Sequence, residues 1–346
     1  MRFFHFFFIF LLILLGAAAG YLYFSQQYVG LLSNAQSASL QANLLALKDY
    51  VVESRTPEEE KSLTMIFVGD IMLDRGVEAI VDNYDNYRYP FLKTFDILKS
   101  ADLAFGNLEG PISNNGEKQG SIYSFRFEPQ VMEGLKFAGF DVLSLANNHI
   151  LDYGREALGN TISILEENSI NSIGAGDNYL EANNPLIKEI GGVKIAFLGY
   201  ALMNPKGYEA SKDYSGTSSF ELERVENEVK TLKALGIADI VVISFHWGEE
   251  YQTRSNKKQQ EIGRALAEAG ADLIVGHHPH VVQELERYKN SWIAYSLGNF
   301  IFDQNFSEET MSGLILRAEI QDKKIKTVEP IEIKIDSSFQ PQLQNN

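Results

Sequence analysis

The chain has 346 residues, of which 45% are hydrophobic, and a formal net charge of −16. This length is sufficient to bury a large core and to build a catalytic site. The acidic balance excludes a nucleic-acid partner, because binding to phosphates needs a surplus of Lys and Arg on one face. The sequence contains no cysteine, so any metal site must be built from His, Asp, Glu and Asn.

The N-terminal segment is apolar and determines the predicted compartment. Only His5 is ionisable between residues 3 and 24, and a bilayer is crossed by about 20 such residues. We predict an uncleaved transmembrane anchor over 1–24 in the cell membrane, with a cytoplasmic N-terminus because Arg2 lies at its start, and an extracytoplasmic folded domain. A cleaved signal peptide is the alternative, because three alanines occupy 17–19, and the chain would then be secreted.

Residues 25–62 are polar and predict a stalk or linker. They are rich in Gln, Ser and Ala, with loosely spaced leucines that are typical of a helical spacer. The folded domain is expected over 63–336, and residues 337–346 predict a loose polar tail.

Beyond residue 63, short apolar runs alternate with helical patterns, which is typical of a mixed α/β domain with buried sheets. The predicted strands are 65–69, 102–106, 141–145, 194–199, 239–244, 272–275 and 292–297. The predicted helices are 91–99, 129–138, 155–168, 219–235 and 256–269. Near the end, a polar turn at 321–323 separates two further apolar segments, which predicts an antiparallel pair of strands.

Polar clusters follow most of these predicted strands, and five of the six histidines lie in them. Strands of an open α/β sheet present their carboxyl ends at one edge, where ligands bind, so the clusters are expected to converge. Taken singly, Asp70 is explained as a turn former or helix cap, and His246 as a core residue with one hydrogen bond. The concentration of histidines at strand ends favours a common site instead.

The side chains of these clusters have the chemistry of a metal site. The candidate ligands are Asp70, Glu109, Asn148, His246, His278 and His280. Oxygen and nitrogen ligands of this kind suit Mn, Fe or Zn. Two neighbouring metals would need one carboxylate to bridge them, and they would polarise a phosphoryl-type oxygen and generate hydroxide from water. We therefore predict one or two divalent transition metal ions as cofactors.

Six motifs occur in order along the chain: GDIMLDRG (69–76), GNLEGPIS (106–113), LANNHILDYG (145–154), FHWGEEY (245–251), GHHPHVVQ (276–283) and YSLGNFIFD (295–303). Together they resemble the CapA family of capsule-biosynthesis and poly-γ-glutamate synthesis proteins, over about 63–305. That family is similar to the calcineurin-like metallophosphoesterases. The resemblance implies a four-layer α/β/β/α sandwich with mixed sheets and a dinuclear metal centre at the strand ends, here preceded by one transmembrane helix.

The resemblance also implies roles for matching residues. Asp70 matches the first-strand ligand and Glu109 the bridging carboxylate, and the remaining matched ligands are Asn148, His246, His278 and His280.

Other matching residues are implied to act on the substrate. His149 is the implied catalytic residue that assists the leaving group, and Asp152 would orient it and hold its tautomer. Arg75, His277 and Asn299 are implied to contact the substrate, with Arg75 as a fork for a phosphate or carboxylate.

Met72 departs from the metallophosphoesterase pattern, whose first motif is Asp-x-His where this chain has Asp70-Ile71-Met72. Methionine is a soft, weak ligand for hard metals. The departure leaves two alternatives: an enzyme with a single metal, or a fold that binds an anionic polymer without hydrolysing it.

The function implied by the resemblance is the biosynthesis or export of a poly-γ-glutamate capsule polymer by a membrane-anchored, metal-dependent hydrolase. One alternative is a non-catalytic subunit that scaffolds a membrane polymer synthase, and another is an extracellular phosphoesterase or nucleotidase. The expected partners are the membrane, subunits of the synthase, and either the anionic polymer or a phosphoester.

Overall fold

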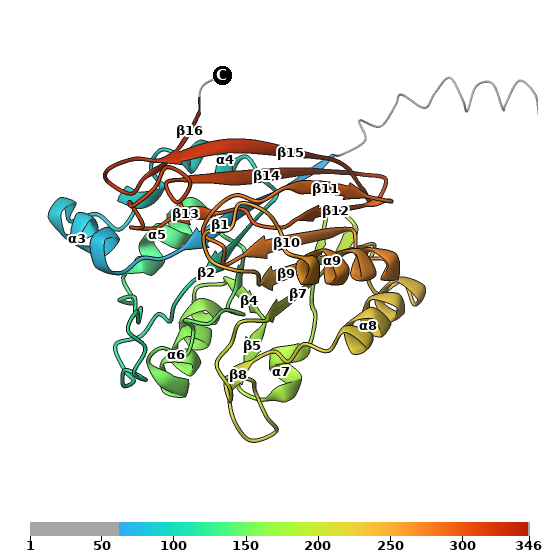
Figure 1. Cartoon of the computed structure of the whole chain (residues 1–346), viewed down its shortest axis with the longest axis horizontal. Coiled ribbons are helices and arrows are strands. Elements are labelled where there is room, and N and C mark those ends of the chain that lie inside the picture. The colour runs from blue at the N-terminus through green and yellow to red at the C-terminus, as the bar shows by residue number, and fades with distance from the viewer. Residues whose placement is uncertain (1–61, 345–346) are drawn as a thin grey trace, which may run out of the picture. The chain divides into compact units, whose positions relative to one another are not determined.

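The computed structural model describes residues 62–344 (Figure 1). The predicted anchor over 1–24 lies outside the described residues, and so does the predicted stalk over 25–62, except for its last residue. Both therefore stay predictions. Within the described part of the chain, no helix has the length and apolar character needed to span a membrane.

The first of two mixed β-sheets contains the N-terminal and C-terminal strands of the described chain. It is built from β1 (Leu63–Ile71), β2 (Leu103–Leu108), β3 (Val142–Ser144), β4 (Asn171–Ile173), β13 (Asn299–Ile301), β14 (Ser312–Gln321), β15 (Lys324–Ile335) and β16 (Pro341–Leu343). The strand order is β16-β15-β14-β1-β2-β3-β4, and β13 also pairs with β1. The pairs from β1 to β4 are parallel, whereas β14, β15 and β16 add antiparallel pairs.

The second sheet has a parallel centre and antiparallel edges. It is built from β6 (Leu186–Ile190), β7 (Val193–Ala201), β9 (Ile240–His246), β10 (Leu273–His277), β11 (Leu285–Tyr288) and β12 (Ser291–Ala294). The order is β11-β12-β10-β9-β7-β6, in which only the edge strands β11 and β6 pair antiparallel. A separate two-stranded sheet joins β5 (Ala175–Gly176) to β8 (Gly216–Thr217).

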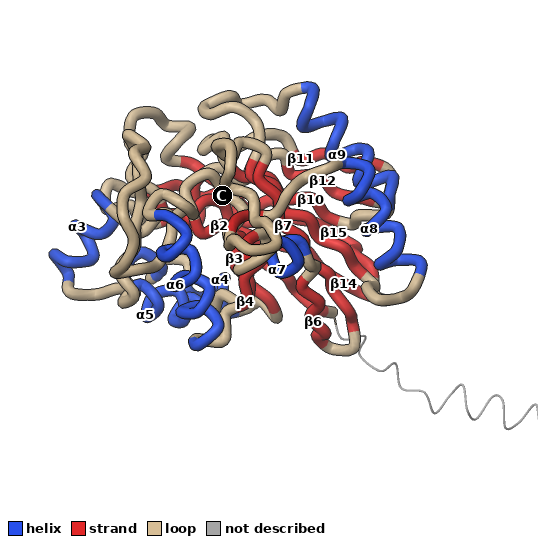
Figure 2. The backbone as a smooth tube through the Cα atoms, turned by 90° about the horizontal axis from the view of Figure 1, so that it is seen from below, coloured by secondary structure: helices blue, strands red, loops and turns tan. Residues whose placement is uncertain are grey.

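Helices cover the outer face of each sheet (Figure 2). The first sheet carries α3 (Arg75–Tyr84), α4 (Phe95–Lys99), α5 (Val131–Ala138) and α6 (Gly154–Glu167), and the second carries α8 (Leu222–Ala234) and α9 (Lys257–Ala269). Two short elements are the 3-10 helix η1 (Tyr89–Phe91) and α7 (Tyr179–Asn183).

The side chains of β1 show how the layers are held together. Because neighbouring residues of a strand point to opposite faces, Met65 and Phe67 pack against the second sheet, whereas Ile66 and Val68 pack under the helices. A strand that is buried on both faces must be apolar throughout, which explains the continuous run that predicted it. The predicted mixed α/β sheets are confirmed, and the cores on their faces give four layers in the order helix, sheet, sheet, helix.

Some predicted elements were wrong in extent. The predicted helix 91–99 is interrupted, because η1 ends at Phe91 and α4 begins only at Phe95. The predicted strand 292–297 ends at Ala294, and the chain then crosses to the first sheet, where β13 pairs with β1.

The C-terminal prediction also needs correction. Part of the predicted loose tail is strand β16, paired with β15, because Gln340 anchors it by donating to the Tyr89 carbonyl at 2.5 Å. The helix α3 was not predicted; the Asp74 side chain caps it by accepting from the Arg75 amide at 2.6 Å.

Candidate metal centre

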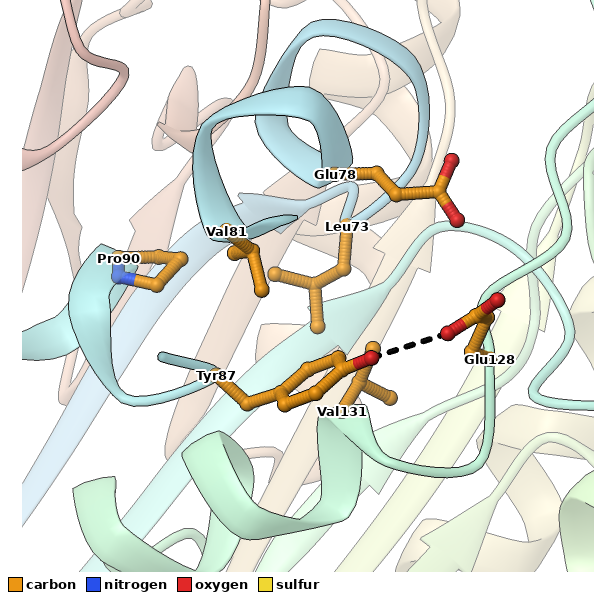
Figure 3. A pocket seen from close by; sticks show the side chains of 7 residues that line it. All are labelled: Leu73, Glu78, Val81, Tyr87, Pro90, Glu128 and Val131. Atoms are coloured by element: carbon orange, nitrogen blue, oxygen red, sulfur yellow. Dashed lines mark hydrogen bonds between the residues drawn. The ribbon is translucent and has the colours of Figure 1, made fainter. Parts of the chain in front are cut away.

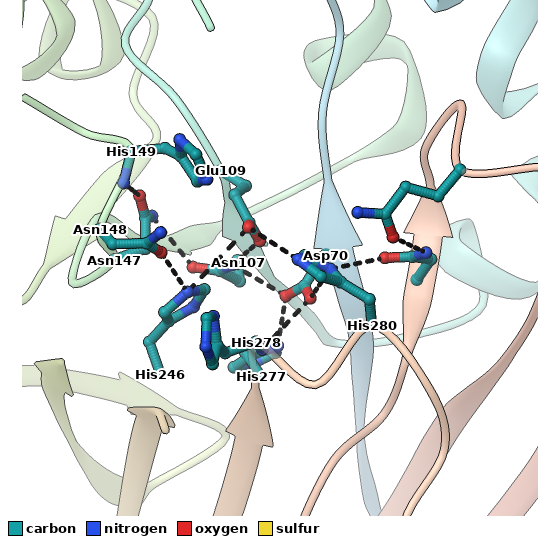
Figure 4. Close-up of polar contacts among 12 residues, drawn as sticks. Asp70, Asn107, Glu109, Asn147, Asn148, His149, His246, His277, His278 and His280 are labelled. Atoms are coloured by element: carbon teal, nitrogen blue, oxygen red, sulfur yellow. Dashed lines mark hydrogen bonds and ion pairs between the residues drawn. The ribbon is translucent and has the colours of Figure 1, made fainter. Parts of the chain in front are cut away.

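The polar clusters at the strand ends come together where the two sheets meet (Figure 4). In the first sheet Asp70 pairs with Asn107 on one side and with Asn299 on the other. In the second sheet His246 pairs with His277. The backbone amide of His278 donates to Asp70 Oδ2 at 3.3 Å, which joins the two sheets at this point.

The two carboxylates of the cluster are completely buried and share one amide. Asn107 Nδ2 donates to Asp70 Oδ1 at 2.9 Å and to Glu109 Oε2 at 3.0 Å. Asn147 Nδ2 in turn donates to Asn107 Oδ1 at 3.2 Å, which fixes the orientation of the Asn107 amide. Asn107 therefore holds Asp70 and Glu109 side by side despite their like charges.

The electrostatic environment of Asp70 and Glu109 favours the binding of a cation. Burial raises the pKa of Asp70, but hydrogen bonds and charges of His277 and His280 outweigh it and hold that pKa well below its usual value. Burial and the neighbouring Asp70 raise the pKa of Glu109 well above its usual value. Within residues 62–344, these two carboxylates form ion pairs with histidines alone. Buried carboxylates without a fixed positive charge are costly, and a bound metal ion would remove that cost.

Two of the histidines, His246 and His278, are held in the neutral form that binds metals. Burial and neighbouring histidines lower the pKa of His246 well below its usual value, and burial and His280 lower that of His278 to about 3. His246 Nε2 lies 2.7 Å from Asn148 Oδ1 and 4.0 Å from Glu109 Oε1. His280 Nε2 lies 3.6 Å from the same Glu109 oxygen. Glu109 Oε1 therefore stands between His246 and His280, as a bridging ligand would.

The ligand atoms form two groups in which all atoms lie within 4.8 Å of one another: Asp70, Glu109 and His246, and Glu250, His278 and His280. Buried side-chain atoms of three of these residues lack a hydrogen-bond partner, namely Glu109 Oε1, His246 Nδ1 and His278 Nδ1. Buried polar atoms are normally satisfied, so unpartnered atoms gathered here fit a cation site. Carboxylates and neutral imidazoles suit Mn, Fe or Zn, and the residues present therefore fit a divalent transition metal.

The backbone of the histidine segment is bent toward this centre. His278 and His280 have left-handed φ values of 95° and 57°. Such values are uncommon for residues other than glycine and are concentrated at functional sites. Two backbone bonds hold the segment against the loop after β9: the Trp247 amide donates to the His277 carbonyl at 3.1 Å, and the Tyr251 amide to the Pro279 carbonyl at 2.8 Å.

His149 and Asp152 lie beside the metal centre and contact each other. His149 Nδ1 lies 2.7 Å from Asp152 Oδ2, which also accepts from the Phe125 amide at 2.9 Å. Because a carboxylate oxygen accepts, Nδ1 carries a proton and Nε2 remains for other contacts. The His149 ring packs on Phe125, with 4.3 Å between ring centroids, so its position is fixed on two sides.

A pocket of about 260 Å³ opens next to the centre. Its lining comprises Arg75, Tyr123, Phe125, His149, Glu250, Tyr251, His280, Phe302, Asp303, Gln304 and Phe306. Arg75 lies in this wall, but its guanidinium is paired with the carboxylate of Asp303 and lies 4.9 Å from the Phe125 ring centroid. The expected fork for an anion is therefore already engaged by a carboxylate of the chain.

The other two residues expected to contact substrate are buried and absent from the pocket lining. His277 lies beneath Asp70, with Nδ1 3.3 Å from Asp70 Oδ1. Asn299 lies behind His280 and its Oδ1 is 3.0 Å from His280 Nδ1. Their geometry suits support of the metal ligands better than contact with substrate.

Sequence reasoning missed two residues of the centre, Asn107 and Glu250. Asn107 lies two residues before Glu109 in a strand, so its position on the same face was available from the strand period. Glu250 follows Glu249, and the sequence offers no signal that selects one of the two. Met72 is buried in the core under the helices, with its sulfur 3.2 Å from the Asp74 amide, and takes no part in the ligand groups.

Comparison with solved structures supports the fold. The fold is similar to that of a 5'-nucleotidase precursor from Thermus thermophilus, with a TM-score of 0.50 and 12% sequence identity, covering 82% of this chain and 55% of that chain. This likeness concerns the fold.

The particular family follows from the sequence. The family model described as bacterial capsule synthesis protein PGA_cap matches residues 64–304, and the chain belongs to this family. It is 37% identical over 263 residues to the capsule biosynthesis protein CapA of Bacillus anthracis, covering 74% of this chain and 64% of that protein. It is 33% identical over 292 residues to the PGA biosynthesis protein CapA of Bacillus subtilis, covering 80% and 75%. The chain thus spans about two thirds of the length of the first relative, and the predicted CapA resemblance is confirmed.

Proposed function

We propose that this chain is a membrane-anchored, extracytoplasmic metal-dependent hydrolase that acts on a poly-γ-glutamate-type capsule polymer. The observation that carries the proposal is the buried cluster of carboxylates and histidines, several of whose polar atoms have no hydrogen-bond partner, beside an open pocket. The names of the two Bacillus relatives, a capsule biosynthesis protein and a PGA biosynthesis protein, support the choice of polymer. The apolar residues 3–24 support the anchor.

The metal ligands would be Asp70, Glu109, Asn148 and His246 on one side and His278 and His280 on the other. A cation bound there supplies a Lewis acid and lowers the pKa of water enough to provide a nucleophile near neutral pH.

His149 supplies the proton transfer of the proposed reaction. With Nδ1–H donated to Asp152, the free Nε2 would accept the proton released by the attacking water and pass it to the leaving group, and the position of His149 in the pocket wall supports this role. Asp152 keeps the required tautomer and contacts no substrate. Asn107 donates to Glu109, whose pKa is raised by burial and by Asp70, and a cation bound beside it would favour the ionised carboxylate.

The attraction for an anionic polymer comes from the metal centre. The chain carries a net charge of −16, and Arg75 is already paired with Asp303. Charges beyond about 8 Å are largely screened at physiological salt, so the bound cations dominate close to the pocket.

Metal content and hydrolysis by the purified full chain test this proposal. We expect one or two transition metals per chain and cleavage of γ-linked glutamate peptides, with both reduced in His278→Ala. A chain that binds no transition metal, and that cleaves neither these peptides nor a chromogenic phosphodiester, would contradict an enzymatic role. Release of phosphate from nucleotides without peptide cleavage would favour the alternative phosphoesterase or nucleotidase function.

The burial of Met72 in the core favours a second candidate, a non-catalytic subunit that scaffolds a polymer synthase, because one ligand position of the metallophosphoesterase pattern is lost. In that case Glu109→Gln would leave capsule formation intact, whereas deletion of residues 1–62 would abolish it. The hydrolase proposal expects both changes to abolish capsule formation.

A further inference from the structure

We propose that Glu250 is a metal ligand, which completes a second cation position with His278 and His280 and supplies that position with anionic charge. This inference rests on the proposed function, because it concerns the same metal centre. It assigns a role to an exposed carboxylate that lies outside the ligand set matched to the family motifs.

The loop after β9 brings Glu250 to the histidine segment. Gly248 and Tyr251 both have positive φ values, of 90° and 63°, so the chain turns sharply on either side of residue 250. Backbone hydrogen bonds from Trp247 to the His277 carbonyl and from Tyr251 to the Pro279 carbonyl attach this turn to the histidine segment at two points. The backbone at Glu250 is therefore held next to the histidine segment.

The two histidines of this position each offer a nitrogen. Asn299 Nδ2 donates to Gln304 Oε1 at 3.1 Å and to the Thr310 carbonyl at 3.0 Å, so Asn299 Oδ1 must accept from His280 Nδ1, 3.0 Å away. This fixes the proton of His280 on Nδ1 and leaves the lone pair on Nε2, which is the arrangement of a metal ligand with its supporting partner. His278 is 5% exposed, and its Nδ1 has no hydrogen-bond partner.

The positive charge of a divalent cation explains why this position needs a carboxylate ligand. Two neutral imidazoles alone leave a divalent cation uncompensated, and Asp70 and Glu109 already belong to the other ligand group. Glu250 forms no ion pair with Lys, Arg or His among residues 62–344, so its charge is free to neutralise a cation. A carboxylate with two imidazoles is a set that Mn, Fe and Zn accept.

The exposure of Glu250 gives this position a distinct property. Glu250 lines the open pocket, whereas Asp70, Glu109 and His246 are completely or almost completely buried. The Glu250 position is therefore in contact with solvent and exchanges its cation more readily than the buried position does.

Titration of the metal-free full chain with MnCl₂, by calorimetry and by metal content after dialysis, tests the inference. Wild type is expected to bind two Mn²⁺ per chain, with the weaker one lost first to a chelator. Glu250→Gln is expected to weaken only that ion, by about 10- to 100-fold or more. The matched control is Glu249→Gln, which makes the same change at the adjacent exposed carboxylate and should leave both affinities unchanged.

The outcomes separate this inference from the proposed function. If Glu250→Gln binds two Mn²⁺ with wild-type affinities, or if wild type binds a single ion whose affinity Glu250→Gln does not alter, the role of Glu250 is wrong, although a metal centre remains. If wild type binds no metal, the proposed function itself fails. Near-ultraviolet circular dichroism of the metal-free variants should match wild type, because Glu250 is exposed and contributes little to the core.

Discussion

Asn107 illustrates how one neutral side chain allows two carboxylates to be buried together. Its amide donates to both Asp70 and Glu109, at 2.9 Å and 3.0 Å. A hydrogen bond to a charged group contributes about 1.5–3 kcal/mol, whereas a third carboxylate at this point would replace two attractions with repulsions.

Asn107→Asp should therefore destabilise the metal-free protein by about 2–4 kcal/mol, and a divalent cation should recover more stability in this variant than in wild type. Urea unfolding with and without MnCl₂ measures both effects. Asn290→Asp, which makes the same change in an exposed turn, is the control and should have little effect. Equal stability of Asn107→Asp and wild type without metal would show that Asn107 is not needed to hold the carboxylates.

Glu78 lies in a small hollow away from the metal centre, between α3 and α5 (Figure 3). The hollow has a volume of about 10 Å³, which is space for about one water and not for a substrate. Burial, followed by the charges of Asp74 and Glu128, raises the pKa of Glu78 to about 7. Glu128 keeps its own position by accepting from Tyr87 Oη at 2.9 Å.

Stability should fall as pH rises through the interval between the unfolded and folded pKa values of Glu78, 4.5 and about 7. Within this interval the folded state binds more protons than the unfolded state, so ionisation favours unfolding. Glu78→Gln should raise stability at pH 8 by about 1 kcal/mol, a value reduced for solvent screening, and by nothing at pH 4. Thermal unfolding at both values measures this. Exposed Glu166, changed to Gln, should show no such pH dependence; an equal effect of Glu78→Gln at both pH values would contradict the assignment.

At the scale of elements, the crossing from β12 to β13 builds the junction on which the centre depends. The chain leaves the second sheet at Ala294 and enters the first at Asn299, where Gly298 has a φ of 69°. The Asp70 amide donates to the Gly298 carbonyl at 3.1 Å. A Cβ on Gly69 would lie 2.0 Å from that carbonyl oxygen, so only glycine allows β1 to approach this closely.

Gly69→Ala should destabilise the protein by about 3 kcal/mol and reduce metal binding, because β1 must move away from Gly298 and carries Asp70 with it. Denaturant unfolding and metal content measure the two effects. Gly192→Ala is the control: its φ is 81°, but no atom lies within 4 Å of the added Cβ, so its cost is about 1 kcal/mol with no effect on metal. Metal binding at wild-type affinity in Gly69→Ala would show that the junction does not position the centre.

For the whole molecule, the net charge of −16 opposes long-range approach of an anionic polymer. If the proposed substrate is correct, salt should screen this repulsion and raise kcat/KM for long γ-glutamate oligomers by several-fold between 20 and 200 mM NaCl. A neutral, amidated oligomer of the same length is the control and should show little change. A fall of kcat/KM for the acidic oligomer with salt would indicate attraction to a basic surface and contradict this account.

Local pattern was sufficient for the main strands and for several helices. The strands β1, β2, β7 and β9 are buried on both faces, so consecutive residues in each of them are apolar. A continuous apolar run can be recognised from the sequence alone. The helix α9 was equally clear, because Asn256 and Gln259 form a capping box at its start and Gly270 ends it in the left-handed conformation.

The sequence by itself determined the kind of side chains at the candidate centre, because a chain without cysteine that gathers histidines and carboxylates after apolar strands offers only nitrogen and oxygen ligands there. Only the tertiary structure decided which of these residues line the pocket, which are buried behind it and which are already paired. Burial separates His277 and Asn299 from the pocket, an ion pair with Asp303 engages Arg75, and the turn against Pro279 selects Glu250 over Glu249. These positions depend on contacts between segments far apart in the chain, so they cannot be predicted from the local spacing of residues.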